Sequence, residues 1–420
     1  MPNKDKNIPK RRFKAFENAD AWELRKLGEL AEIVRGASPR PIQDPKWFDE
    51  QSEIGWLRIS DVTEQDGRIY HLEQKISKLG QQKTRVLVEP HLLLSIAATV
   101  GKPVVNYVKT GVHDGFLIFL EPCFEQEFMF QWLEMFRSYW SKYGQPGSQV
   151  NLNSDLVKKQ ELSIPTLPEQ EDIGTFFSTL DRHITLHQRK LDKLKSVKQA
   201  YLSEMFPAEG ERVPKRRFPG FTDDWEQRKL GEVIEKLKGG VSIAPNDYIE
   251  DGHRTIPKGA VNDTGVADMS ACKNVSVDFF EKNYFSKTST GELITSLRDL
   301  VPSAPNLGRI VRIVGQFEEF IMPQGVYSLK ITDNLLEDFL IAYSNNYIYR
   351  SVIQSEKNGS TQVHIRNGEF LNIKIQVPSL PEQSAIGTFF STLDRHITLH
   401  QRKLEKLKNL KKALLNELFV

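Results

Sequence analysis

The chain contains the same segment twice. The nineteen residues from Ile173 to Leu191, IGTFFSTLDRHITLHQRKL, recur unchanged from Ile386 to Leu404. Each copy follows a lead-in of the form PxLPEQ, at residues 165–170 and 378–383. Self-similarity at this spacing indicates a chain built from two related units, and at 420 residues more than one hydrophobic core is expected.

A second pair of matching segments opens the two halves. Each copy begins with PKRRF and continues to a Trp and an LGE triplet, and the matched residues are 9–13, Phe16, Trp22 and 27–29 against 214–218, Phe221, Trp225 and 230–232. Between the borders the halves diverge, over about 35–159 and 238–372, with weak echoes at Gly36 with Gly240 and Gly101 with Gly308. Matching borders around two divergent inserts are what we expect of a protein that recognises two different targets. Recent recombination would also leave identical borders.

The repeated borders have the pattern of long helices. Apolar residues recur at alternating steps of three and four, from Ile173 to Met205 and from Ile386 to Leu418, which is typical of a coiled-coil seam. Pro207 and Gly210 are expected to end the first helix. Each helix would cover about 35 residues, or roughly 50 Å. We expect the two helices to form an intramolecular antiparallel pair; the alternative is that each packs only on its own globular neighbour.

The outer faces of these helices are basic, although the net charge of the chain is only +2. Residues 182–198 contain six Lys or Arg against one acid, and residues 395–412 contain seven against one. Such a face is commonly only solvated. Beside DNA, the same side chains would contact phosphates without reading sequence.

Sequence signatures of catalysis fail on inspection. His183 with His187 and His396 with His400 have the i, i+4 spacing of metal ligands, but further ligands are missing, so packing or surface roles compete with metal binding. Residues 97–102 end like a phosphate loop, yet Pro103 stands where a Ser or Thr must be, which favours strand, turn, strand. We therefore expect no catalytic residues and no bound metal.

Cysteine content and hydropathy place the chain in a broad class. Cys123 and Cys272 are isolated in sequence, so we expect buried thiols in a reducing cytoplasm rather than a disulfide or a zinc site. The polar N-terminus has no signal-peptide pattern. The longest apolar patch, Leu92–Val100, is too short to cross a bilayer. A soluble, cytoplasmic protein is expected.

The divergent inserts predict mixed strands and helices. Strands are expected at residues 55–61, 92–96, 292–296 and 310–313, and helices at 128–143 and 335–353. Each helix leads into a polar loop, at residues 144–151 and 358–364. Asn, Gln, Ser, Arg and Lys can hydrogen-bond base edges, although most polar loops contact only water.

Two diverged domains, each opened by an RRF, F, W and LGE segment and closed by a PxLPEQ helix, resemble the specificity subunit of type I restriction-modification systems. The resemblance spans the whole chain. It implies a mixed α/β (α+β) fold with two target recognition domains at 1–165 and 207–378. These would be separated by spacer helices at 166–206 and 379–420, which form an antiparallel coiled coil with pseudo-two-fold symmetry.

The resemblance also implies function and partners. Each domain would read one half of a bipartite, interrupted site on double-stranded DNA. The helices would dock two methylation subunits, which restriction subunits can join; S-adenosylmethionine, ATP and Mg²⁺ would then bind to those partners and no cofactor to this chain. The spacer or docking positions are Phe176, Phe177, Leu180, Ile184 and Leu191, with Phe389, Phe390, Leu393, Ile397 and Leu404.

Candidate DNA contacts follow from the polar positions of the two inserts. They are Ser38, Arg40, Arg58, Lys102, Ser148, Gln149 and Asn151 in the first half, and Ser242, Lys258, Arg298, Arg309, Ser360, Gln362 and His364 in the second. Two other classes of function remain as alternatives. One is a non-enzymatic coiled-coil scaffold; the other is a stand-alone DNA methyltransferase or nuclease with an unrecognised site.

Overall fold

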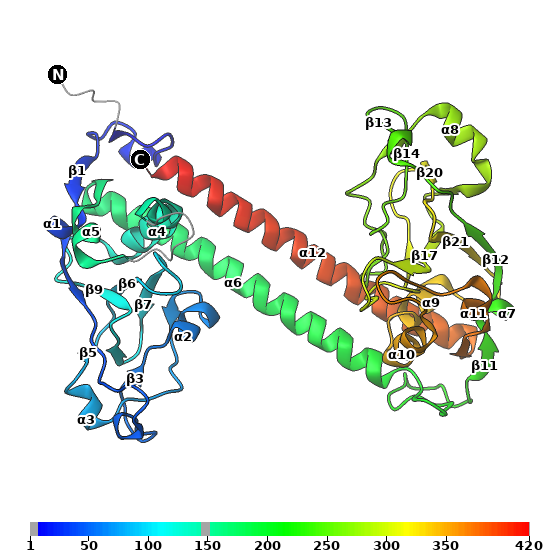
Figure 1. Ribbon diagram of the computed structural model, residues 1–420, viewed down its shortest axis with the longest axis horizontal. Coiled ribbons are helices and arrows are strands. Elements are labelled where there is room, and N and C mark those ends of the chain that lie inside the picture. Colours follow the sequence, from blue (N-terminus) through cyan, green and yellow to red (C-terminus); the bar gives the residue numbers. More distant parts are fainter. Residues whose placement is uncertain (1–6, 144–151, 420) are drawn as a thin grey trace. The chain divides into compact units, whose positions relative to one another are not determined.

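The computed structural model describes residues 7–143 and 152–419. It divides into two compact units, one formed by Met1–Leu186 with Leu404–Val420 and the other by His187–Lys403. Each unit contains one insert and a segment of each of the two long helices, α6 (Leu167–Glu204) and α12 (Leu380–Leu418) (Figure 1). The two helices lie where the repeated segments predict them, and α6 ends before Pro207 as expected.

The first unit is built on a five-stranded sheet in the order β2-β9-β6-β7-β4, with a three-stranded sheet β3-β8-β5 and the pair β1-β10. Its elements before α6 are η2 (Lys14–Phe16), β1 (Glu23–Lys26), α1 (Leu27–Leu30), β2 (Glu32–Arg35), η3 (Pro45–Trp47), β3 (Gly55–Trp56), α2 (Ile59–Glu64), β4 (Arg68–Ile69), α3 (Lys78–Gln81), β5 (Arg85–Leu87), β6 (Leu92–Ser95), β7 (Pro103–Asn106), β8 (Thr110–Val112), β9 (Phe116–Leu120), α4 (Gln126–Phe136), η4 (Arg137–Tyr143), α5 (Ser154–Lys159) and β10 (Glu161–Ile164).

The second unit is built on a four-stranded sheet in the order β12-β21-β17-β19, with the smaller sheets β13-β15-β14, β16-β20, β18-β22 and β11-β23. Its elements between α6 and α12 are β11 (Glu226–Lys229), α7 (Leu230–Val233), β12 (Ile234–Gly239), η5 (Pro245–Asp247), β13 (Tyr248–Ile249), β14 (His253–Arg254), β15 (Asn274–Val275), α8 (Val277–Lys282), η6 (Tyr284–Ser286), β16 (Lys287–Ser289), β17 (Leu293–Ser296), β18 (Arg298–Asp299), β19 (Ile310–Arg312), β20 (Glu319–Ile321), β21 (Val326–Ile331), α9 (Glu337–Tyr343), α10 (Tyr347–Glu356), β22 (Val363–His364), α11 (Asn367–Asn372) and β23 (Lys374–Val377).

The two units share one framework. The order β2-β9-β6-β7 in the first corresponds to β12-β21-β17-β19 in the second, and the antiparallel pair β1-β10 corresponds to β11-β23. The weak sequence echoes mark equivalent points of this framework. The N–H of Gly36 donates to the carbonyl of Phe116 at the start of β9, and the N–H of Gly240 donates to that of Val326 at the start of β21. The units are therefore structural duplicates, as the repeats predict.

The repeated PxLPEQ segment is hydrogen-bonded to the start of an insert helix in each unit. The Gln170 side chain donates to the Pro165 carbonyl at 2.8 Å and accepts from the N–H of Glu125, which caps α4, at 2.9 Å. Gln383 makes the same two bonds, to the Pro378 carbonyl and from the N–H of Leu336 before α9. Because both glutamines are buried, these bonds fix the start of each long helix against that insert helix.

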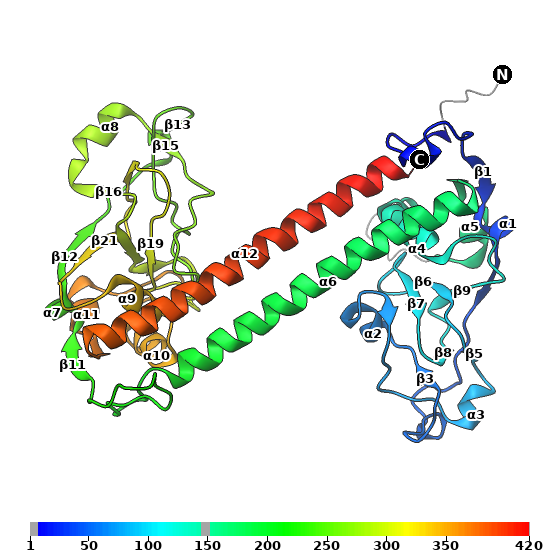
Figure 2. The same ribbon diagram turned by 180° about the vertical axis from the view of Figure 1, so that it is seen from behind.

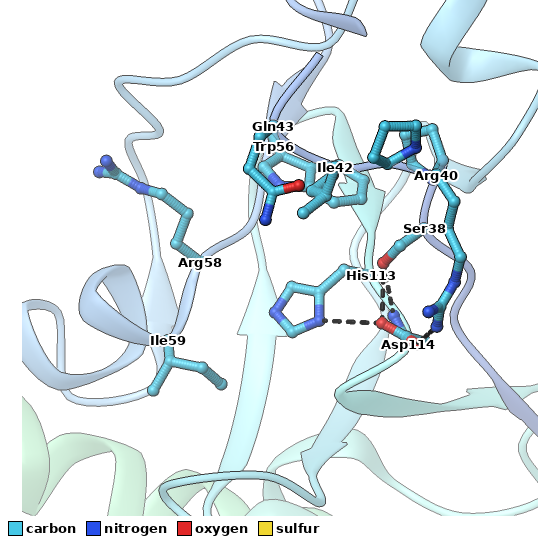
Figure 3. Close-up of a pocket in the computed structure, with 11 residues that line it drawn as sticks. Ser38, Arg40, Ile42, Gln43, Trp56, Arg58, Ile59, His113 and Asp114 are labelled. Carbon is cyan, nitrogen blue, oxygen red and sulfur yellow. Dashed lines mark hydrogen bonds and ion pairs between the residues drawn. The ribbon is translucent and has the colours of Figure 1, made fainter.

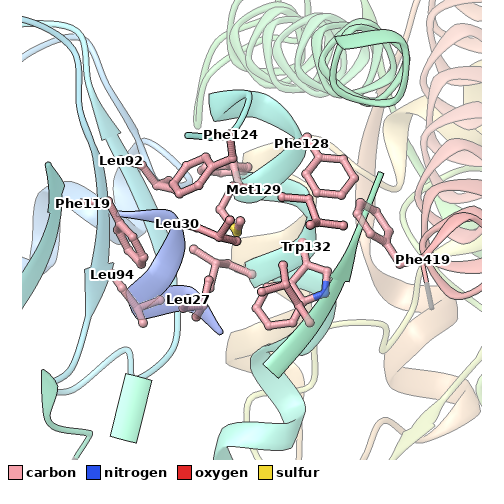
Figure 4. Packing of buried hydrophobic residues seen from close by; sticks show 14 of the residues in the cluster. Leu27, Leu30, Leu92, Leu94, Phe119, Phe124, Phe128, Met129, Trp132 and Phe419 are labelled. Atoms are coloured by element: carbon pink, nitrogen blue, oxygen red, sulfur yellow. The ribbon is translucent and has the colours of Figure 1, made fainter. Parts of the chain in front are cut away.

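Helix α4 carries the core of the first unit. Figure 4 shows Phe128, Met129 and Trp132 of α4 packed between Leu27 of α1 and Phe419 near the end of α12. The second unit has the equivalent cluster, in which Phe339 of α9 contacts Trp225 and Phe206. Each core therefore contains apolar side chains from the insert and from both long helices.

Within each unit the helix segments run antiparallel, as Figure 2 lets the reader follow. In the first unit, Phe177 stacks on Phe419 at 6.0 Å and Asp181 pairs with Lys411 at 2.6 Å. In the second, His187 lies beside His400 and Tyr201 contacts Phe389. The expectation that α6 and α12 contact each other is confirmed, and α6 also packs on its own domain. Knobs-into-holes packing stays a prediction.

Most predicted seam positions are buried or half-buried, and one is wrong. Phe177, Leu180, Leu191, Phe390, Leu393, Ile397 and Leu404 are buried, while Phe176, Ile184 and Phe389 are half-buried. Leu410, which continues the three-and-four spacing of apolar residues between Ile386 and Leu418, is 44% exposed. At about 100° per residue, Leu410 is turned roughly 120° from Leu404, whereas Lys411 is turned back to within about 20°. Lys411 therefore faces α6, where its ion pair with Asp181 replaces an apolar contact.

Several expectations for the inserts need correction. The expected strand 55–61 ends after Trp56, because Asp61 caps the N–H of Arg58 and starts α2. The expected helix 128–143 continues after Phe136 as the 3-10 helix η4. The expected helix 335–353 is two helices, because Asn346 caps a new start at Tyr347. The strands at 92–96, 292–296 and 310–313 are confirmed within one or two residues.

The expectation of buried thiols is also wrong. Cys123 is exposed and Cys272 is half-exposed. Cys123 follows β9 in a surface turn that is held by its backbone, since its N–H donates to the carbonyl of Leu30, and this leaves the side chain free to point outward. None of the helices in the described part of the chain has an apolar stretch long enough to cross a membrane.

Candidate nucleic-acid interface

A surface pocket in the first unit brings three predicted residues together. Ser38, Arg40 and Arg58 line a cavity of about 670 Å³ (Figure 3). Residues 38–43, which follow β2, form one wall, and Trp56 of β3 contributes apolar surface. The pocket also contains His113 and Asp114, from the turn between β8 and β9.

Asp114 organises the polar wall of this pocket. Its carboxylate accepts from the Ser38 hydroxyl at 2.8 Å and pairs with Arg40 at 3.1 Å, while its carbonyl accepts from Arg35 at 2.6 Å. Burial alone would raise the pKa of Asp114, but the hydrogen bond from Ser38 and the charge of Arg35 lower it. The carboxylate is therefore ionised at neutral pH and holds Arg40 at the pocket, where the arginine side chain remains 82% exposed.

His113 presents a neutral imidazole to the same pocket. Burial lowers the pKa of His113, against the opposing charge of Asp114. Its Nδ1 lies 2.8 Å from the N–H of Gly115 and accepts that bond, so the proton is assigned to Nε2. The ring is then a donor as well as an apolar surface, which meets Phe116 edge-on at 4.8 Å and lies tilted against Trp56 at 5.9 Å.

The presence of Ser38, His113 and Asp114 in one pocket does not make a catalytic triad. The Ser38 hydroxyl donates to the Asp114 carboxylate, whereas an activated serine must donate to the imidazole. The Nδ1 of His113 is 3.9 Å from Asp114 and is already used by Gly115. The pocket instead offers arginine and imidazole donors beside a tryptophan, a set suited to base edges and phosphates.

The other cations of the first half have structural partners. Arg58 pairs with Asp61 at 2.9 Å and with Glu73 at 3.4 Å, and its side chain is 36% exposed. Lys102 is only 11% exposed and is paired with Asp66 and Glu134. Their DNA contacts stay predictions, and Lys102 would have to exchange existing ion pairs to make one. Three further predicted residues, Ser148, Gln149 and Asn151, lie outside the described residues.

In the second unit, the predicted residues gather around the end of β17. Arg298 in β18 pairs in register with His364 in β22, and both are exposed. Ser360 and Gln362 are exposed on the turn that leads into β22. Arg309 closes the connection from β17 to β19.

Arg309 is held more tightly than its neighbours. Burial lowers its pKa, and its guanidinium donates to the Asn345 side chain and to the Pro305 carbonyl. Two predicted residues lie elsewhere in the unit. Ser242 follows β12 at the position equivalent to Ser38, and Lys258 is exposed in a turn after β14.

Sequence reasoning missed several residues of these surfaces. His113 and Asp114 lie between two strands, and the pattern of a polar pair followed by glycine could have indicated a turn but not a pocket. Arg350 and Gln354 of α10 and Lys357 directly after it were also missed, because their spacing looks like that of an ordinary solvated helix face.

One histidine of each predicted pair contacts the other helix. His187 Nδ1 lies 3.0 Å from His400 Nδ1, so one ring donates and the other accepts, and at least one is neutral. Burial and the nearby charge of Lys190 lower the pKa of His400. Over residues 7–143 and 152–419, no group of three or more His, Cys, Asp or Glu side chains is arranged to hold a metal ion.

Comparison with known proteins decides what kind of protein this framework belongs to. The model of the type I restriction modification DNA specificity domain matches residues 19–196 and again 222–409. The chain belongs to that family. Its members are the non-catalytic subunits that recognise DNA sequence in type I restriction-modification systems, and this chain is one of them.

Two relatives and one solved structure are similar to this chain over almost its whole length. The type I restriction enzyme MjaVIII specificity subunit of Methanocaldococcus jannaschii is 20% identical, covering 94% of this chain and 91% of the relative. The putative MjaX specificity subunit of the same organism is 21% identical, covering 95% and 93%. The crystal structure of the type I S subunit from M. genitalium matches with a TM-score of 0.65 at 12% identity, covering 98% and 99%.

Proposed function

We propose that each unit of this specificity subunit recognises one half of a bipartite, interrupted DNA site. The observation that carries the proposal is one framework with two unlike polar surfaces. In the first unit, the segment after β2 lines the pocket around Asp114; in the second, polar side chains collect where β18 meets β22. Matching frameworks with different contact surfaces are what two different half-sites require.

We assign the functions of recognition and spacing to the domains and helices at the boundaries that the sequence predicts. The recognition domains are residues 1–165 and 207–378, and the helices 166–206 and 379–420 form an antiparallel coiled coil that sets the distance between the half-sites. The helices also dock two methylation subunits, to which restriction subunits can be added. S-adenosylmethionine, ATP and Mg²⁺ bind those partners, and the complex works in the cytoplasm.

The side chains proposed to contact DNA differ in how exposed they are and in whether their donors already have partners. Arg40, Ser242, Lys258, Arg298, Ser360, Gln362 and His364 are exposed, and Ser38 and Arg58 line the pocket. An exposed arginine can form a bidentate pair with guanine in the major groove or contact a phosphate. We expect the exposed residues to contribute more to binding than Lys102 and Arg309, whose donors have partners within the fold.

The test is an exchange of inserts. The chain is expressed with its methylation partner, and the methylated site is determined by methylome sequencing. Residues 35–159 are then replaced by the insert of another family member, and in a matched variant residues 238–372 are replaced instead. Each exchange should change one half of the methylated site and leave the other half unchanged.

Three results would contradict the proposal. If both halves change, or neither changes, the two units do not recognise separate half-sites. Methyl transfer or DNA cleavage by the isolated chain, with S-adenosylmethionine or Mg²⁺, would indicate catalysis by this chain. Tight binding of protein partners without a footprint on DNA would indicate a scaffold.

A further inference from the structure

The connection from β17 to β19 is longer than its counterpart in the first unit. In both units it begins at a serine whose carbonyl accepts the N–H of a glycine with positive φ, Ser95 with Gly101 and Ser296 with Gly308. Five residues, 96–100, separate the first pair, and eleven, 297–307, separate the second. The second unit therefore carries six extra residues at an equivalent point of the framework.

The extra residues form a loop whose backbone is fixed by α10. Arg350 donates to the carbonyls of Leu307, Ala304 and Pro305. Gln354 donates to the Ser303 carbonyl at 3.0 Å, and Lys357 donates to the Pro302 carbonyl at 2.7 Å. Side chains of α10 and of its C-terminal cap residue thus bind five carbonyls of the loop, which fixes the conformation of the loop backbone.

Two apolar side chains of this loop are exposed to solvent. Leu300 is 56% exposed and Val301 is 45% exposed, whereas Leu297 and Leu307 at the two ends of the loop are buried. A loop that is anchored through its backbone and its ends while its apolar tip stays in solvent gains no folding stability from that tip. Such a tip is suited to contact with another molecule.

The charge around the loop fits a polyanion. In the described part of the chain, Arg298, Arg309, Arg350 and Lys357 form no ion pair with a carboxylate, because their donors go to carbonyl and amide oxygens. Burial and the neighbouring charge of Arg309 lower the pKa of Arg350 to about 10, so it remains charged at neutral pH. The loop carries one acid, Asp299, whose carboxylate caps backbone N–H groups of the loop itself.

We propose that residues 299–307 form a reading loop that enters the major groove of the second half-site, and that Arg350 is the residue that positions it. Leu300 and Val301 would contact the methyl group of thymine, the apolar feature of that groove. Arg298, which is exposed at the base of the loop, would face phosphates. This inference rests on the proposed function and assigns it a specific element that the first unit lacks.

The test compares Arg350→Met with Arg366→Met in complex with the methylation partner. Both changes remove one positive charge from the second unit, but the Arg366 side chain is 76% exposed and pairs with Glu369 rather than with carbonyls of the loop. Methylation rates are measured on the natural site and on duplexes with one altered base pair at each position. Arg350→Met should lower discrimination in the second half-site by about 10- to 100-fold and leave the first half unchanged. Arg366→Met should leave both unchanged.

A second pair of variants separates positioning from folding. Leu300→Ala and Val301→Ala remove exposed tip side chains, so the unfolding temperature should not change, while discrimination at thymine positions of the second half-site should fall. Unchanged discrimination in Arg350→Met and in both tip variants would overturn the reading loop, as would an equal loss in both halves. If the natural complex methylates no bipartite site, the proposed function fails, and the loop with it; a specific natural complex with unaltered variants overturns the loop alone.

Discussion

The guanidinium of Arg12 donates two hydrogen bonds to the carboxylate of Glu169, from Nε to Oε1 and from Nη2 to Oε2, both at 2.7 Å. Arg217 and Glu382 repeat this geometry in the second unit, at 2.6 and 2.7 Å. Both glutamates are buried, with 1% of the side chain exposed. In each half, the RRF motif thus supplies the arginine and the PxLPEQ motif the glutamate of a buried ion pair, although the two motifs are more than 150 residues apart in the chain.

Breaking this pair should destabilise one unit at a time. Glu169→Gln leaves the Arg12 charge buried without its counter-charge, and Glu382→Gln does the same to Arg217. We expect each to cost about 3–5 kcal/mol of unfolding free energy. Denaturant unfolding, followed by hydrogen exchange to locate the affected unit, would check this. Exchange that increases equally in both units would contradict the assignment of one pair to each unit.

Gly36 and Gly240 should both be intolerant of a side chain. A Cβ at Gly36 would lie 2.2 Å from the carbonyl oxygen of His113, and one at Gly240 would lie 2.2 Å from that of Pro323. Each alanine variant should lose about 1–3 kcal/mol or more, since backbone must move. Gly259→Ala is the matched control, because its Cβ would meet nothing within 4 Å. Thermal unfolding of all three variants measures the difference.

Asp394 should make the second unit less stable as pH rises. Burial, only partly offset by Lys198 at 2.5 Å, raises the pKa of Asp394 to about 6 from its ordinary 3.8. The folded state therefore binds more protons than the unfolded state between these values, and the stability contributed by protonation is lost as pH rises through about 6. Asp394→Asn cannot titrate and should gain roughly 2–3 kcal/mol relative to the natural chain between pH 4 and pH 7. Denaturant unfolding of both proteins at several pH values in this range measures the difference between their unfolding free energies. If that difference does not change with pH, the predicted contribution of Asp394 is wrong.

Arg40 and Lys102 should respond differently to loss of charge. Arg40 is 82% exposed, so Arg40→Met should weaken DNA binding and reduce the salt dependence of the affinity by about one released counterion. Lys102 is 11% exposed between Asp66 and Glu134, so Lys102→Met should mainly lower stability. Filter binding of the complex at several salt concentrations, with unfolding of the free chain, distinguishes the two. A salt slope that changes for Lys102→Met and not for Arg40→Met would reverse this assignment.

Several features of the candidate site were beyond sequence reasoning for a physical reason. The sequence indicates Ser38, Arg40 and Arg58 only singly, as polar insert residues, because the carboxylate that organises the pocket, Asp114, is 74 residues from Arg40 in the chain. The helix 335–353 was expected to be continuous because periodicity does not register a cap such as Asn346 within an apolar stretch. Lys411, and not the apolar Leu410, faces α6. The position of a residue around the helix and the ion pair with Asp181 decide this, and apolarity alone does not.

The sequence by itself determined the duplication, the two long helices and the family, because identical borders and a helical period survive whatever the inserts contain. Only the tertiary structure decided which polar residues are free and which are already paired. Lys102 and Arg40 look alike in sequence, but the first is enclosed by two carboxylates and the second extends into solvent. Contacts between residues distant in the chain decide whether a charge is available to DNA, and composition and spacing do not encode them.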